Sequence, residues 1–542
     1  MKKIILFCAF FYACTAFAAP SVRNLNTDEL IGQTLVVRVD AGEQAKYEQA
    51  VKEGLIGTVL IKGGSLEAGN AAEKRAAARQ TIADLRRWEK ESRHQIPLLI
   101  AFDYEGGAVV SPLFLGLKQL PSNMLMSASA AGPSAVYAMF RAAGREIKSM
   151  DGQISFAPDL DVNTNPQNPV IGTRSFGSDA KTVGANGALA VKALQKEKVA
   201  AFAKHFPGHG DTVVDSHLGS PVMDLPPQQL EEEHIAAFRT AVKNGVWGVM
   251  SSHVVYPALD PEHPATFSRK ILTDLLRKNM KFKGVIATDS LDMEGAKREH
   301  GIAQAAAEAY AAGADMPLIG KDLPYETIAY VKSQIGKTLT EKQLKQSAKR
   351  ILDLKRKTGL FSAAKPPKET PESFETAARR IARGGVTLVK NEANLIPVRK
   401  TVPQRVCAVF FSEPILKEQI SAVLDPFEKA GWQTQLVYAG QTPPDETLDA
   451  ARQCADDKGL LLLGSTQKYD RPDPQQQKII DGLLSENANA VLISALSPYD
   501  IAFYPRARTV LAVYGPTPDV MQAAGDVILG HLTPAGKMPV QL

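Results

Sequence analysis

Short apolar runs alternate with helix-prone stretches through the first two-thirds of the chain. Eight such runs occur, at residues 34–39, 57–61, 97–103, 153–158, 199–203, 247–253, 284–288 and 314–319. The segments between them, such as 71–90 and 185–196, are rich in alanine and lysine and favour helix. Strands that alternate with helices predict a parallel sheet with right-handed crossovers. Eight strands over about 300 residues are typical of a (β/α)8 barrel.

A second pattern of the same kind follows the first. A capping box of Thr340 and Gln343 predicts a helix that runs to about Arg356. Residues 362–373 are rich in proline, lysine and glutamate, which is typical of a linker. Apolar runs then resume at 406–411, 434–437, 459–463, 490–496 and 509–514. We therefore predict a catalytic barrel over 20–361, a linker over 362–376 and a three-layer α/β/α sandwich over 377–542.

The N-terminus has the pattern of a secretory signal. Lys2 and Lys3 precede an apolar run over residues 4–17, and Ala16 and Ala18 provide a small-x-small cleavage site. We predict a signal peptide over residues 1–19 and an exported protein, periplasmic or secreted. An uncleaved anchor is disfavoured because the run is too short to cross a bilayer, and lipid attachment at Cys14 is a weaker alternative. No later stretch approaches about 20 apolar residues, so we expect no stable membrane span.

Composition narrows the classes of function. The 542 residues are 44% hydrophobic and 22% charged, as in ordinary globular proteins. A formal net charge of +5 is too weak and dispersed to indicate a nucleic-acid partner. Export permits a disulfide between Cys407 and Cys454, although the sequence does not show whether they are close. The sequence indicates no oligomeric state.

Ionisable residues follow the predicted strands at the point where each strand ends. They are Asp103 and Glu105 after the third strand, Asp159 and Asp161 after the fourth, Lys204 and His205 after the fifth, His253 after the sixth and Asp289 after the seventh. A barrel enzyme places its active site on this face. The pattern therefore predicts an enzyme whose site is assembled from several strand ends.

The densest chemistry lies in residues 204–217, which hold three of the nine histidines. Pro207, Gly208 and Gly210 oppose a regular helix, so we predict a loop that leaves the fifth strand. Asp215 and His217 are two residues apart, and a carboxylate beside an imidazole can support general acid/base catalysis. The alternative is a purely structural histidine–aspartate pair.

The sequence leaves the role of Asp289 open. It could be a nucleophile, a base or a metal ligand, or it could cap a helix that begins at Ser290.

Other chemistries have weaker support. His205 and His209 have the spacing of a helical zinc motif, but the intervening proline and glycine break the helix, and we expect no metal. The chain lacks a nucleophile elbow and a nucleotide-binding glycine loop, so we expect no cofactor.

The sequence resembles family 3 glycoside hydrolases, and in particular their β-N-acetylhexosaminidase branch. The resemblance rests on Lys-His-Phe-Pro-Gly-His-Gly at 204–210 followed by Asp-Ser-His at 215–217. Further family blocks occur in order at 103–107, 172–177, 252–260 and 287–293. The match spans roughly residues 28–358. Residues 385–392 and 534–540 also resemble the second domain of two-domain members.

The resemblance implies roles for eight residues. Asp289 corresponds to the catalytic nucleophile, and His217 to the general acid/base with Asp215 as its partner. The residues that correspond to sugar-binding positions are Asp103, Arg174, Lys204, His205 and, on a weaker match, His253. The implied activity is that of a retaining exo-β-N-acetylglucosaminidase that removes terminal N-acetylglucosamine from peptidoglycan fragments or chitin-like oligosaccharides.

Two departures keep other functions open. The family's hexosaminidases usually carry arginines after the residue that corresponds to Gly107, where this chain has Ala-Val-Val-Ser. Those that recycle cell-wall fragments are usually cytoplasmic and single-domain. The alternatives are an N-acetylglucosaminide phosphorylase, a β-glucosidase of the same family, or a non-catalytic protein that binds wall glycans.

Overall fold

The computed structural model describes residues 21–64, 69–107, 109, 111–299, 301–362, 371–399, 401–455, 459–467 and 471–542. The predicted signal peptide and most of the predicted linker lie outside these residues. Within the described part of the chain, no helix combines the length and the apolar character needed to cross a membrane.

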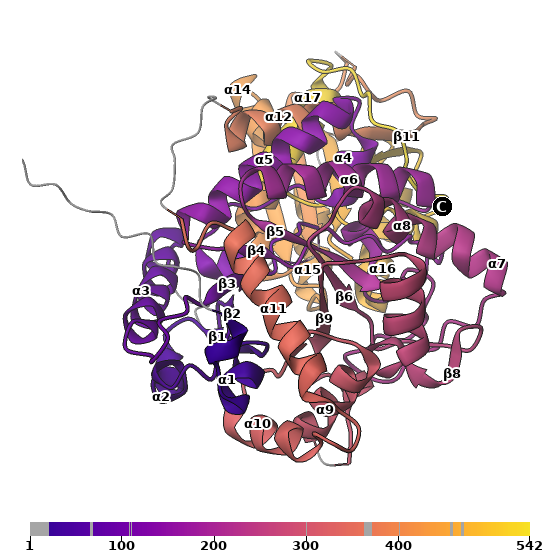
Figure 1. Ribbon diagram of the computed structural model, residues 1–542. Coiled ribbons are helices and arrows are strands. Elements are labelled where there is room, and N and C mark those ends of the chain that lie inside the picture. Colours follow the sequence, from indigo (N-terminus) through magenta and orange to yellow (C-terminus); the bar gives the residue numbers. More distant parts are fainter. Residues whose placement is uncertain are drawn as a thin grey trace, which may run out of the picture.

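Eight parallel strands form a closed barrel in the first part of the chain (Figure 1). Around the barrel their order is β1, β10, β9, β6, β5, β4, β3 and β2. The strands are β1 (Val36–Asp40), β2 (Thr58–Lys62), β3 (Leu99–Phe102), β4 (Ile154–Ser155), β5 (Ala200–Phe206), β6 (Gly248–Ser251), β9 (Val285–Ser290) and β10 (Met316–Leu318). Each overlaps one of the eight apolar runs, so the predicted (β/α)8 barrel is confirmed.

Helices cover the outside of this barrel. They are α1 (Thr27–Gly32), α2 (Glu48–Lys52), α3 (Ala71–Glu89), α4 (Asn123–Ala128), α5 (Gly132–Ser149), α6 (Ala180–Lys196), α7 (Pro227–Leu230), α8 (Ala236–Lys243), α9 (Gly301–Ala312), α10 (Pro324–Ser333) and α11 (Glu341–Lys357), with two π-helical segments, η5 (Glu231–Ile235) and η7 (Lys270–Asn279). A two-stranded hairpin of β7 (Val255–Tyr256) and β8 (Asp260–Pro264) follows β6. The predicted capping box is present, because Thr340 Oγ1 accepts a hydrogen bond from the Gln343 amide and the Gln343 side chain accepts one from the Thr340 amide.

The barrel interior is packed with apolar side chains from all eight strands. Phe156, which follows β4, and Phe202 of β5 meet edge to face with ring centroids 5.3 Å apart. Ile351 and Leu354 of α11 belong to the same buried cluster. The interior is thus a core, and polar chemistry is confined to the strand ends.

A six-stranded sheet forms the core of the second domain, in the order β11, β16, β15, β14, β12 and β13. Its strands are β11 (Thr387–Asn391), β12 (Arg405–Phe411), β13 (Gln433–Ala439), β14 (Leu460–Ser465), β15 (Ala490–Ser494) and β16 (Thr509–Ala512). The helices of this domain are α12 (Phe374–Gly385), α13 (Lys417–Ser421), α14 (Asp425–Lys429), α15 (Glu446–Ala455), α16 (Pro474–Glu486) and α17 (Pro518–Leu529). Five strands are parallel and match the five predicted runs, and the α/β sandwich is confirmed.

Strand β11 is the one strand of this sheet that the apolar pattern does not predict. It pairs antiparallel with β16 at the edge of the sheet, and most of its residues are only half-buried. Helix α12 begins at Phe374, within the segment predicted as linker. The predicted domain boundaries themselves stay a prediction.

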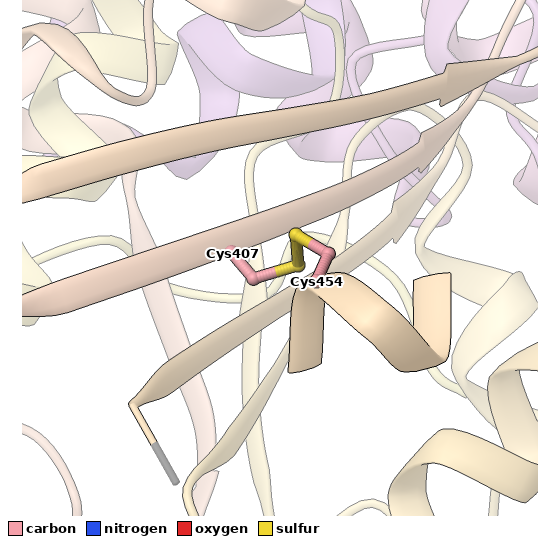
Figure 2. Close-up of a disulfide and its surroundings, with 2 residues drawn as sticks. All are labelled: Cys407 and Cys454. Atoms are coloured by element: carbon pink, nitrogen blue, oxygen red, sulfur yellow. A yellow bond between two sulfur atoms is a disulfide. The ribbon is translucent and has the colours of Figure 1, made fainter. Parts of the chain in front are cut away.

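Cys407 and Cys454 form a disulfide, a pairing that the sequence leaves open (Figure 2). Cys407 lies on β12, Cys454 lies on α15, and their Cα atoms are 5.7 Å apart. The bond fixes α15 against β12, the strand next to the edge strand β13.

The two domains are in direct contact. Helix α12 packs on α4 and α5, and the Ser129 hydroxyl donates to the Ile381 carbonyl at 2.9 Å. The Asn163 side-chain amide donates to the Tyr499 hydroxyl at 2.9 Å. Near the C-terminus, the Ser178 amide donates to the Pro539 carbonyl at 3.2 Å.

Candidate active site

The carboxyl ends of several barrel strands surround a cavity of about 170 Å³. Its lining residues are Lys62, Asp103, Glu105, Val109, Val170, Arg174, Lys204, His205, His209, Ser216, His217 and Asp289. Six of the eight residues predicted for the site are in this set. The seventh, Asp215, contacts His217, and the eighth, His253, lies outside the described cavity lining.

Lys204 and His205 are part of strand β5, contrary to the prediction that they lie in the loop after it. The strand continues to Phe206, which pairs with Ser251 of β6, and Lys204 forms a bridge with Asp159. The helix-breaking residues begin only at Pro207. A strand holds these two side chains more rigidly than a loop would, which suits groups that must position a substrate.

A buried carboxylate, Glu105, links two cations of the site, Arg174 and Lys204. Arg174 donates to both of its oxygens, from Nε at 3.1 Å and from Nη2 at 3.2 Å, and Lys204 Nζ lies 2.8 Å from Oε1. Burial opposes the charge on Glu105, but Arg174 and Lys204 outweigh it and hold the pKa of Glu105 below its usual value. The sequence predicts Glu105 at the site without a role, and in the structure Glu105 orients Arg174 and Lys204.

Asp103 contacts two lysines, and one of them, Lys62, is not among the predicted site residues. Lys62, at the end of β2, forms an ion pair with Oδ2 of Asp103, and Lys204 Nζ lies 3.5 Å from Oδ1. Burial acts against ionisation of Asp103, but the ammonium groups of Lys62 and Lys204 keep its pKa well below the usual range. The ordered, ionised carboxylate can accept hydrogen bonds from sugar hydroxyls.

His205 is held between a buried aspartate and Arg174. Its Nδ1 lies 2.6 Å from Asp161 Oδ2, and its Nε2 lies 3.2 Å from Arg174 Nη2. Burial lowers the pKa of His205 to about 4, so the ring is neutral near pH 7. Because a guanidinium can only donate, we assign the proton to Nδ1 and the lone pair to Nε2. Asp161 therefore sets the tautomer of His205, a role that its position in the sequence did not reveal.

Asp289 lies near the end of β9, with Oδ2 3.8 Å from His205 Nε2. The Ser290 amide donates to its Oδ1 at 2.8 Å. Burial would raise its pKa, but His205, His253, Lys204 and His217 together lower it. The carboxylate is therefore ionised near neutral pH, as a nucleophile must be.

His253 contacts the backbone at the end of β9. Its Nε2 lies 3.0 Å from the Ser290 carbonyl oxygen, and its Nδ1 lies 2.9 Å from Thr266 Oγ1. The ring is buried and stacks on Phe267. These contacts orient the residue next to Asp289, and direct contact of His253 with a sugar stays a prediction.

The predicted dyad is present as a hydrogen-bonded pair on the loop after β5. Nδ1 of His217 lies 2.7 Å from Oδ1 of Asp215, and the His217 amide donates to the same oxygen at 2.9 Å. The His217 side chain is 58% exposed. Its hydrogen bond with Asp215 raises the pKa of His217, against the effect of burial and with help from the charge of Asp289. The imidazole is thus accessible and can carry a proton near neutrality.

Two groups of side chains among the described residues are close enough to share an ion. They are Asp159, Asp161 and His205, and Asp260, Glu262 and His263. The first group already has a cation, since Arg174 Nε lies 3.6 Å from Asp159 Oδ2. His209 forms hydrogen bonds through both ring nitrogens, with Thr212 and Ser216. These contacts favour an organised polar network over the zinc alternative.

Comparison with known proteins decides the family. The sequence profile described as "Glycosyl hydrolase family 3 N terminal domain" matches residues 26–354. The chain belongs to glycosyl hydrolase family 3. The match covers the whole barrel, from β1 to most of α11, so this family 3 enzyme carries its cavity in the domain that defines the family.

Two curated relatives match the family 3 chain over nearly its whole length. β-Hexosaminidase A of Pseudoalteromonas piscicida is 28% identical, with 98% of this chain and 99% of that protein covered. A β-N-acetylglucosaminidase/β-glucosidase of Cellulomonas fimi is also 28% identical, with 97% and 95% covered. The second domain is therefore shared with both relatives.

A solved structure has the same two-domain architecture. It is a glycoside hydrolase family 3 β-N-acetylglucosaminidase from a Paenibacillus species, which superposes with a TM-score of 0.84 at 28% identity. The alignment covers 96% of this chain and 99% of that one. The barrel and the second sheet thus have a common arrangement in both proteins.

Proposed function

We propose that this family 3 glycoside hydrolase is a retaining exo-β-N-acetylglucosaminidase. The hydrogen-bonded Asp215–His217 pair carries the proposal, because it places a proton donor at the same cavity as Asp289, an ionised nucleophile. The names of the curated relatives and of the solved Paenibacillus enzyme support the choice of N-acetylglucosamine.

In the first step, Asp289 attacks the anomeric carbon and the glycosidic bond breaks. The imidazolium of His217 gives its proton to the leaving oxygen, and a glycosyl-enzyme ester forms on Asp289. Asp215 remains ionised throughout, since burial alone opposes its charge while its hydrogen bonds with His217 lower its pKa. It thereby stabilises the imidazolium before the transfer.

In the second step, neutral His217 removes a proton from water. The resulting hydroxide equivalent attacks the same anomeric carbon, the ester bond breaks, and Asp289 is released as a carboxylate. Two displacements give retention of configuration. A neutral imidazole as base adds no negative charge beside Asp289, so it does not raise the pKa of the nucleophile.

We place one sugar ring of the substrate in the cavity. Asp103, Arg174, Lys204 and His205 present charged or neutral hydrogen-bonding groups to its hydroxyls. A volume of about 170 Å³ is below the usual size of a pocket for a drug-sized ligand, which supports the removal of single terminal residues.

We further propose that the enzyme acts after export, on peptidoglycan fragments or chitin-like oligosaccharides. The signal-like N-terminus supports export. The buried Cys407–Cys454 disulfide also supports it, because such bonds persist in oxidising compartments.

The test is hydrolysis of an aryl N-acetyl-β-glucosaminide by wild type, Asp289→Ala and His217→Ala. We expect retention of configuration in the wild type and at least about a thousandfold loss of kcat/KM in Asp289→Ala. His263→Ala, on the exposed hairpin, is the matched control and should retain activity. Full activity in Asp289→Ala would contradict the mechanism.

The same assay separates the alternatives. Sugar 1-phosphate formed in phosphate buffer would identify a phosphorylase, and faster turnover of the aryl glucoside would identify a β-glucosidase. Binding of N-acetylglucosamine oligomers without turnover would identify a binding protein. Product analysis with muropeptides and with chitobiose then assigns the natural substrate class.

A further inference from the structure

Exposed apolar side chains are concentrated on the loop that carries the Asp215–His217 pair. Of seven large apolar side chains exposed among the described residues, four lie between positions 213 and 222. They are Val213, Val214, Leu218 and Val222, which we call the apolar edge; Leu218 is 82% exposed and Val213 is 68% exposed. Clusters of this kind mark places where a ligand or partner binds.

Hydrogen bonds hold this loop in a defined turn. The amides of Leu218 and Gly219 donate to the Asp215 carbonyl at 2.9 and 3.1 Å. The turn is attached to η8 (Glu294–Ala296), because the Gly295 amide donates to the Ser216 carbonyl at 3.2 Å. Val222 forms a bridge with Val255 of β7. The backbone is thus fixed in the turn of residues 215–219 and at Val222, while the side chains of the apolar edge remain exposed.

The position of the edge relative to the chemistry follows from His217. Ser216 and His217 line the cavity, and Leu218 is the next residue along the chain. A general acid must lie within hydrogen-bonding distance of the oxygen that it protonates. On the proposed function the cavity holds the transferred sugar, so the group attached to that oxygen leaves the cavity beside His217, which Leu218 of the apolar edge follows directly in the chain.

We propose that the apolar edge binds the leaving group of the substrate and selects leaving groups with an apolar face. The C–H face of the next pyranose ring, or an alkyl or aryl group in its place, fits this chemistry. The inference rests on the proposed function, because it takes the His217 side of the cavity as the leaving-group side. It adds a specificity determinant on the leaving-group side to a site whose other proposed binding residues hold the sugar that is transferred.

The experiment compares two substrates that carry the same sugar. One is the 2,4-dinitrophenyl glycoside, with a large apolar leaving group, and the other is the glycosyl fluoride, with a leaving group too small to reach the edge. Neither leaving group needs a proton, so changes in the position of His217 affect the two reactions equally. The value of kcat/KM reports the step in which the leaving group departs.

The variants are Leu218→Ser and Val213→Ser, with Leu323→Ser as control. Leu323 is an exposed leucine of the loop after β10 that is absent from the described lining of the cavity. We expect Leu218→Ser to lose about fivefold in kcat/KM on the dinitrophenyl glycoside, the effect of losing part of a leucine contact, and less than about twofold on the fluoride. Val213→Ser should change in the same direction, and Leu323→Ser should match wild type on both substrates.

Two results would overturn the proposal. Equal losses on both substrates would mean that the edge packs against the enzyme itself, and unchanged activity on the dinitrophenyl glycoside would mean that it contacts nothing in the reaction. A wild type that hydrolyses neither substrate contradicts the proposed function, and the leaving-group proposal falls with it. If only the leaving-group proposal is wrong, the wild type still hydrolyses both substrates, so the two failures can be told apart.

Discussion

Asp215 accepts hydrogen bonds from both Nδ1 and the backbone amide of His217, at 2.7 and 2.9 Å. The pair lies on a single turn, so one carboxylate fixes the ring orientation, the tautomer and the charge of the imidazole. Nε2 is left for the substrate. A histidine bound in this way can donate a proton near neutral pH and recover it in the second half of the reaction.

The first prediction concerns the pH dependence of Asp215→Asn. The Asp215 carboxylate raises the pKa of His217, and a neutral amide removes this effect. His217 should then lose its proton at a lower pH, so the alkaline limb of kcat/KM should move towards acid while kcat falls by at least about a hundredfold. The measurement is kcat/KM for an aryl N-acetyl-β-glucosaminide as a function of pH.

The control for this prediction is Asp211→Asn. Asp211 lies on the same loop but accepts from the Thr164 hydroxyl at 2.7 Å, an interaction that an amide oxygen can keep. Its profile should match wild type. An unshifted alkaline limb in Asp215→Asn would show that another group donates the proton.

The second prediction concerns Glu105→Gln. Glu105 is 1% exposed, and its negative charge neutralises both Arg174 and Lys204. A neutral glutamine would leave these two buried cations without that negative partner. We expect kcat/KM to fall by at least about a hundredfold and the free energy of unfolding to fall by about 3 kcal/mol. Kinetics and urea denaturation of the same preparation measure both effects.

Glu375→Gln provides the comparison. Glu375 pairs with Lys118 on the surface and is 55% exposed in its side chain, so its loss should change stability by less than about 1 kcal/mol. Wild-type kinetics in Glu105→Gln would show that Arg174 and Lys204 keep their positions without it.

The third prediction concerns the disulfide of the second domain. Cys407 and Cys454 are 47 residues apart, and closing a loop of that length restricts the unfolded chain. Replacing both cysteines with alanine should destabilise the second domain by about 4 kcal/mol on the chain-entropy model. Urea denaturation with and without a reductant measures the effect, and reductant should shift the wild type but not the variant. A wild type that does not respond to reductant during unfolding would contradict a stabilising disulfide.

The fold was largely predictable because buried parallel strands are nearly continuous apolar runs. Val285 to Ala287 and Leu460 to Leu463 are fully buried and stand out in the sequence. β11 was missed because an edge strand needs no such run. The loop after β5 was predicted to begin at Lys204, because the polar residues Lys204 and His205 directly precede the helix-breaking Pro207 and Gly208. In the structure β5 continues to Phe206.

The site was predictable as a set of strand ends, but its pairings were not. Residues at successive strand ends converge in any barrel, which is why Asp103, Lys204 and Asp289 could be grouped. Glu105 and Arg174 are 69 residues apart, and Asp161 and His205 are 44 apart, so their contacts depend on the three-dimensional register of the strands. Lys62 was missed because a lone lysine at a strand end has no signal of its own in the sequence.

The measurement that tests the central claim most directly is covalent trapping of the glycosyl-enzyme. A 5-fluoro-N-acetylglucosaminyl fluoride slows the second displacement, so the intact mass should rise by one fluorinated sugar, and peptide mapping should place that sugar on Asp289. Asp289→Asn should acquire no label. A label on another carboxylate, or no label on an enzyme that consumes the reagent, would contradict the assignment of Asp289 as the nucleophile.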